Sequence, residues 1–111
     1  GHKTKPSEKL LNSGPFELIN CTDINTIEAV VKKHNIDSVY HLAALLSAVA
    51  EANPRLAWDV NMNGLYNTLE VAREYKCALF TPSSIGAFGP STPLDNTPQD
   101  TTQRPNTIYG V

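Results

Sequence analysis

The chain has 111 residues, 41% of them hydrophobic and 18% charged, which is the composition of one globular domain rather than of a disordered segment. The formal net charge of -2 and the lack of a basic block argue against nucleic acid or an anionic membrane as the main partner. No apolar run approaches the roughly 20 residues that cross a bilayer, and the polar residues 1–6 lack a signal-peptide core. Cys21 and Cys77 are too few for a disulfide framework, so we expect two free thiols in a reducing compartment.

The N-terminal part of the chain predicts a loop, a strand and a helix. Residues 1–15 are mostly polar and are expected to form a surface loop with a short turn around residues 8–11. Residues 16–21 are expected to form a short strand. Thr22 and Asp23 then offer side-chain oxygens that can cap a helix, and apolar residues recur at helical spacing over residues 24–34.

A second strand and a long helix follow. Residues 38–44 run from apolar to small side chains, which predicts a strand, and residues 45–52 are expected to form a loop of small and apolar residues. Asn53 and Pro54 predict the start of a helix that reaches about residue 76, because proline suits the first helical position. The apolar face of this helix is expected to consist of Leu56, Ala57, Val60, Gly64, Leu65, Leu69 and Ala72.

A third strand is expected from Ala78, and it runs into the adjacent hydroxyls of Ser83 and Ser84. Residues 89–106 are rich in proline, threonine and asparagine and predict a long loop. The alternation of strands and helices predicts an α/β fold with parallel strands and right-handed crossovers. Because ligands of such sheets bind at the carboxyl ends of the strands, we expect a ligand crevice beside these serines.

Ser84 and Tyr109 are the candidate catalytic residues. Oxidation of an alcohol by hydride transfer needs a base for the hydroxyl proton and a donor that holds the oxygen. A free tyrosine has a pKa of about 10, so a nearby cation would have to favour its phenolate form. On residue types alone, the simpler interpretation is favoured: an aromatic residue at the start of a helix and ordinary strand-end hydroxyls.

The end of the second strand has the small side chains that a flat cofactor needs beside the backbone, at Ala43 and Ala44. His41 is expected to satisfy its ring nitrogens inside the fold. No second histidine, cysteine or carboxylate follows it at ligand spacing, so no metal site is predicted.

Four further residues have two interpretations each. Asn61 is a weak helix former within a helix, so it either bonds neighbouring backbone near the site or faces solvent. Ser47 lies either near the substrate or in an ordinary loop. Trp58 and Met62 are expected to serve in packing or at an interface rather than in chemistry.

Several motifs, in this order, resemble the extended short-chain dehydrogenase/reductase family, which is NAD-dependent epimerase/dehydratase-like. They are the His-Leu-Ala-Ala run at residues 41–44, the Asn-Met-Asn-Gly step at residues 61–64, the serine pair before Ala-Phe-Gly at residues 87–89, and Tyr109. Within that family, the runs at residues 43–48, 82–90 and 103–111 are most like those of the L-threonine 3-dehydrogenases. Sugar-nucleotide epimerases usually carry a different loop after the serine pair. The resemblance covers about residues 14–111.

The resemblance implies a Rossmann-like NAD-binding domain and a role for each matching residue. Tyr109 would be the general base and Ser84 would hold the substrate hydroxyl. Ser47 and Ser83 would contact the substrate, and Asn61 would support the active-site hydrogen bonds. The cofactor site would consist of Leu42, Ala43, Ala44, Thr81, Pro82 and Tyr109. The substrate would be L-threonine, the cofactor NAD, and the complete protein a homodimer paired through the long helix.

Two parts of the family's pattern do not occur in these residues. The glycine-rich loop for the pyrophosphate is not found, and the lysine of the Tyr-x-x-x-Lys motif would fall two positions beyond Val111. We therefore expect a fragment of a single NAD-binding domain that binds NAD weakly and does not turn over by itself. A nucleotide-sugar epimerase or dehydratase and a non-catalytic Rossmann-like remnant remain alternatives. The expected location is the cytoplasm, or the mitochondrion if the source is an animal.

Overall fold

The computed structural model describes residues 6–111, so the first five residues of the predicted N-terminal loop lie outside the description. Its helices are α1 (Glu8–Leu11), α2 (Ile24–His34), α3 (Ser47–Ala52), α4 (Pro54–Trp58) and α5 (Gly64–Tyr75), and its strands are β1 (Ser38–Tyr40) and β2 (Ala78–Phe80). A π-helical turn, Asp59–Asn63, joins α4 to α5, and a 3-10 turn, Ile85–Ala87, follows β2. None of the helices described has both the length and the apolar character to span a bilayer.

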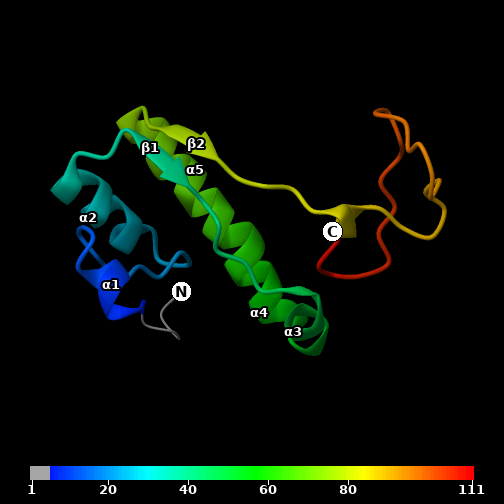
Figure 1. The fold of residues 1–111 in the computed structure, drawn as a ribbon, viewed down its shortest axis with the longest axis horizontal. Coiled ribbons are helices and arrows are strands. Elements are labelled where there is room, and N and C mark those ends of the chain that lie inside the picture. The colour runs from blue at the N-terminus through cyan, green and yellow to red at the C-terminus, as the bar shows by residue number, and fades with distance from the viewer. Residues whose placement is uncertain (1–5) are drawn as a thin grey trace.

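The two strands form a parallel sheet, which confirms the predicted α/β class. Val39 is paired with Leu79, and Tyr40 with Phe80. Their crossover runs through α3, α4 and α5, and α5 lies alongside both strands in Figure 1. Both strands are shorter than predicted, because the ladder ends at residues 40 and 80.

The strand predicted over residues 16–21 is wrong. The segment makes no ladder with β1 or β2, and a strand needs a neighbour whose N–H and C=O groups it can bond. Side chains hold it instead: the Asn67 amide donates to the Cys21 carbonyl over 3.0 Å, and Glu17 pairs with Lys33 at 2.6 Å and with His34 at 3.0 Å.

The helix predicted over residues 24–34 is confirmed as α2. The Asp23 carboxylate accepts from the Asn25 N–H over 3.0 Å, and Asn35 ends the helix in the left-handed conformation at φ 50°. Ile27 and Val31 are buried and meet Val71 of α5 in the hydrophobic core. This contact between helices fixes α5 against the N-terminal half of the chain.

The long helix predicted from Pro54 is confirmed, although its apolar face was partly wrong. Its buried residues are Ala57, Gly64, Thr68, Val71 and Ala72, whereas Leu56 and Leu69 are 47% and 46% exposed. The π-helical turn adds a residue to the ladder and rotates the later turns relative to the earlier ones. Gly64 packs closely against Cys21: a Cβ there would lie 2.8 Å from the Cys21 sulfur, and that side chain would have to shift.

The loop predicted over residues 45–52 is helical from Ser47 onward. Its three alanines favour a helix, and one of them, Ala50, is fully buried. The long loop over residues 89–106 has no regular structure, as predicted. It stands away from the helices in Figure 1, and the radius of gyration of 16.4 Å exceeds the roughly 13 Å of a compact domain of this size.

Candidate active site

The carboxyl ends of β1 and β2 lie at one edge of the sheet, because the strands are parallel neighbours. Ala43 and Ala44 follow β1, Thr81 and Pro82 follow β2, and all four are exposed. Leu42 is 67% exposed. Methyl groups and open backbone leave room for a flat dinucleotide to lie against this edge, so these residues fit NAD.

His41 is buried at the same edge and is held by Thr68. Its Nδ1 lies 3.1 Å from the Thr68 hydroxyl, which itself donates to the Gly64 carbonyl over 2.8 Å. The hydroxyl can therefore accept a hydrogen bond from an Nδ1–H of the imidazole. Burial lowers the pKa of His41. Nε2 is buried and has no partner among residues 6–111.

Asn61 holds the main chain that follows β1. Its side-chain oxygen accepts from the Leu45 N–H over 2.7 Å, and its NH₂ group donates to the Leu45 carbonyl over 3.1 Å. The π-helical turn presents this side chain, and such turns are frequent at functional sites. Of the two interpretations offered for Asn61, the structure therefore supports bonding to nearby backbone.

Ser84 and Tyr109 converge on Gly86. A Cβ built on Gly86 would lie 3.4 Å from the Ser84 hydroxyl oxygen and 3.0 Å from the Tyr109 ring. The same hydroxyl oxygen accepts from the Gly86 N–H over 3.1 Å, which leaves its proton for an outside acceptor. The two candidate catalytic side chains, 25 positions apart in the sequence, thus face one small space.

Glycines let the chain return to this space after the long loop. A Cβ on Gly89 would lie 1.8 Å from the Arg104 carbonyl oxygen, and one on Gly110 would lie 2.1 Å from the Gly86 carbonyl oxygen. Real Cβ atoms do not approach backbone so closely, so glycine is required at both positions. These contacts bring Tyr109 back beside the 3-10 turn that follows β2.

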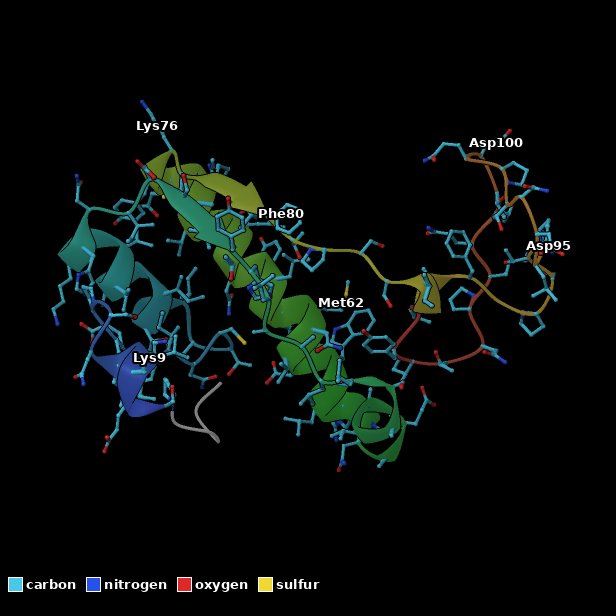
Figure 2. The ribbon with its side chains drawn as sticks, in the orientation of Figure 1. Lys9, Met62, Lys76, Phe80, Asp95 and Asp100 are labelled. Carbon is cyan, nitrogen blue, oxygen red and sulfur yellow. The ribbon has the colours of Figure 1, made fainter. Side chains whose placement is uncertain are left out.

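The remaining predicted site residues lie in the segment after the long loop, residues 107–111, and at the start of α3. Tyr109 lines a small cavity with Asn61, Trp58 and Met62, and Figure 2 shows Met62 on the long helix. Ser47 begins α3 and is exposed, and no hydrogen bond joins it to Ser84 or Tyr109.

The structure also shows the surroundings of Ser83 and of the two cysteines. Ser83 is exposed at the end of β2. Cys21 and Cys77 are both free thiols, as expected. Within residues 6–111, no group of three or more histidine, cysteine or carboxylate side chains is placed to hold a metal ion.

Two contacts of this site between distant residues were not predicted from the sequence. Glu51 of α3 accepts from the Ile108 N–H over 2.7 Å, across 57 positions of the chain. Thr68, the partner of His41, was also missed. Glu51 is the only charged residue among residues 45–52, which marks it as a candidate for a specific contact but does not indicate its partner.

The sequence profile of the NAD dependent epimerase/dehydratase family matches residues 1–111. The chain belongs to this family. It is therefore related to NAD-dependent enzymes, and the residues that fit NAD at the sheet edge are consistent with the cofactor of the family.

Three similar proteins define the likeness further. The chain is 60% identical to an uncharacterized epimerase/dehydratase of Staphylococcus saprophyticus, over 91% of the chain and 32% of that protein. It is 52% identical to the L-threonine dehydrogenase of Clostridium difficile, with a TM-score of 0.91 over 98% of the chain and 34% of that structure. It is 45% identical to a monomeric L-threonine 3-dehydrogenase from a metagenome, with a TM-score of 0.88 over 96% of the chain and 34% of that structure. The chain thus spans about a third of the length of the relatives it matches.

Proposed function

We propose that these residues form part of the NAD-binding domain of an L-threonine 3-dehydrogenase. The observation that carries the proposal is the convergence of the Ser84 hydroxyl and the Tyr109 ring on Gly86. A second support is the 52% identity and the TM-score of 0.91 to a solved L-threonine dehydrogenase. The reaction would convert L-threonine and NAD⁺ to 2-amino-3-ketobutyrate, NADH and a proton.

Each side chain has a defined task in this proposal. The Tyr109 phenolate would take the proton of the substrate hydroxyl, and the Ser84 hydroxyl would donate a hydrogen bond to the same oxygen. Bound NAD⁺ supplies the hydride acceptor. Ser47 and Ser83 would contact the amino-acid part of the substrate.

The edge of the sheet would hold the cofactor. Leu42, Ala43, Ala44, Thr81 and Pro82 would lie along it, and all are exposed. Asn61 would act on the cofactor edge indirectly, through the backbone of Leu45, because both ends of its amide are bonded to that residue.

The alternative within the family is a nucleotide-sugar epimerase or dehydratase. The name of the staphylococcal relative favours neither activity. The two reactions differ in their products, since threonine oxidation accumulates NADH whereas an epimerase returns its hydride to the sugar. A non-catalytic remnant would do neither.

The test is an assay of the full-length protein that carries this sequence. We expect NADH absorbance to rise with L-threonine and NAD⁺, and no interconversion of UDP-glucose and UDP-galactose. The 111-residue chain assayed alone should show no turnover. Sugar interconversion without threonine oxidation would contradict the proposed function. Threonine turnover by the short chain would contradict the expectation that it is an inactive fragment.

Subunit pairing and location complete the proposal. We expect a homodimer through the long helix, where Trp58 and Met62 are 47% and 42% exposed, in the cytoplasm of a bacterium. One similar L-threonine 3-dehydrogenase is described as monomeric, so the assembly has to be measured. Light scattering of the full-length protein separates a dimer from a monomer.

A further inference from the structure

Glu51 connects α3 to the segment that carries Tyr109. Its carboxylate oxygen Oε1 accepts from the Ile108 N–H over 2.7 Å and lies 3.5 Å from the Tyr109 nitrogen as a second donor. One oxygen thus contacts two successive backbone donors that are 57 and 58 positions away in the sequence.

The segment that receives this carboxylate is a tight turn. The Gly110 N–H bonds to both the carbonyl and the hydroxyl of Thr107, each over 3.1 Å. Among residues 6–111, the N–H groups of Ile108 and Tyr109 bond to no backbone carbonyl, and the Glu51 carboxylate lies within reach of both. Unpaired donors at such a start favour a negative charge, and Glu51 provides it.

The contact is the last link of a connected path. Asn61 of the long helix fixes the backbone of Leu45 through two hydrogen bonds. Two residues later α3 begins, and its Ala50 is fully buried beside the position of Glu51. Glu51 then reaches Tyr109, so the position of the tyrosine backbone is tied to the helix that packs behind the sheet.

We propose that Glu51 is a positioning residue that sets where the Tyr109 phenol lies relative to Ser84. The proposal rests on the proposed function, since it assigns Glu51 a task in that same site. A displacement of about 1 Å in a reacting group can cost about a hundredfold in rate. Loss of this anchor is therefore expected to lower kcat far more than it raises KM for the substrate.

The experiment compares the full-length wild-type protein with four single-residue variants. Glu51→Ala removes the acceptor, and Glu51→Gln keeps an uncharged oxygen at the same reach. Glu70→Ala is the matched control, because among residues 6–111 its carboxylate pairs with Arg73 alone, on the surface of α5. Tyr109→Phe gives the rate that remains without the phenol. Unfolding midpoints establish that each variant is folded.

Two readouts are expected to change together. Glu51→Ala should lower kcat about tenfold or more with KM within about threefold, and should speed amide hydrogen exchange in a peptide that covers residues 105–111. Glu51→Gln should recover most of kcat, and Glu70→Ala should match the wild type in both readouts. Unchanged exchange or an unchanged kcat in Glu51→Ala would overturn the inference, as would Glu51→Gln behaving like Glu51→Ala.

The two proposals fail in different ways. If the wild-type protein does not oxidise L-threonine, the proposed function fails, and the exchange measurement still decides whether Glu51 anchors the segment. If the wild type is active and Glu51→Ala equals it, only the role of Glu51 fails.

Discussion

Asn61 and Leu45 form a closed pair in which both ends of the side-chain amide are bonded to the backbone of one residue. Asn61 comes from the π-helical turn, and Leu45 lies between the end of β1 and the start of α3. The pair therefore fixes the course of the chain just after the edge of the sheet where NAD is expected.

Replacing Asn61 with alanine should weaken NAD binding. Each hydrogen bond contributes about 1 kcal/mol, so loss of the pair corresponds to at most roughly thirtyfold in affinity if all of it is transmitted to the cofactor edge. Calorimetric titration of the full-length protein with NAD measures this. Asn63→Ala is the control, because within the described part of the chain that exposed amide bonds to Asp59 alone. Equal affinities of Asn61→Ala and wild type would contradict the prediction.

Tyr109→Phe and Ser84→Ala should remove the two proton-handling groups. General acid–base groups contribute about a hundredfold to ten-thousandfold, so we expect kcat to fall by at least about a hundredfold in each variant. NAD binding should stay within about threefold in Ser84→Ala, because Ser84 is not among the residues proposed to hold the cofactor. Steady-state kinetics measure the fall, and Tyr66→Phe, a 62% exposed tyrosine of α5, serves as the matched control. More than about a tenth of wild-type kcat in Tyr109→Phe would exclude a phenol base.

Gly89→Ala should destabilise the return of the long loop. Its new Cβ would meet the Arg104 carbonyl oxygen at 1.8 Å, and this backbone atom cannot rotate away. Overpacking of this kind costs about 1–3 kcal/mol, so denaturant unfolding should show a lower midpoint. Gly14→Ala is the comparison, since nothing lies within 4 Å of a Cβ there, and a change within about 0.5 kcal/mol is expected. Equal stability of the two variants would refute the packing argument.

Thr68→Val should lower the free energy of unfolding, although valine has nearly the same shape as threonine. Valine keeps the branched side chain but leaves the His41 Nδ1–H buried without an acceptor, which costs about 1–3 kcal/mol. Thr68→Ser keeps the hydroxyl and should lose less. Urea unfolding of both variants is the measurement. If serine proved as harmful as valine, the hydrogen bond to His41 would not be the cause.

The stability of the protein should fall as the pH drops below about 6.5. Burial lowers the pKa of folded His41 below its ordinary value of 6.5, so the unfolded chain binds a proton that the folded chain does not, and acid favours unfolding. The paired carboxylates of Glu17 and Glu28, whose pKa values are lowered from 4.5, respond only at lower pH. Melting temperatures from about pH 8 to about pH 5 for wild type and His41→Gln isolate this contribution. Parallel pH profiles of the two proteins would contradict it.

Elements with local signals could be predicted from the amino-acid sequence. The carboxylate of Asp23 and the left-handed Asn35 delimit α2, and Pro54 begins the long helix, because capping and proline geometry act over a few residues. The motifs at residues 41–44, 83–84 and 109 also sufficed to indicate the family that the comparison confirms. The roles of Ser84 and Tyr109 in chemistry remain predictions.

Which distant groups meet depends on the packing of the whole fold. Residues 16–21 have a strand-like sequence and form no strand, because pairing depends on a neighbour and not on the segment itself. The contacts of Asn61 with Leu45 and of Glu51 with Ile108 join positions 16 and 57 residues apart. Such contacts depend on how helices and loops pack in three dimensions, and no short-range pattern in the sequence encodes them.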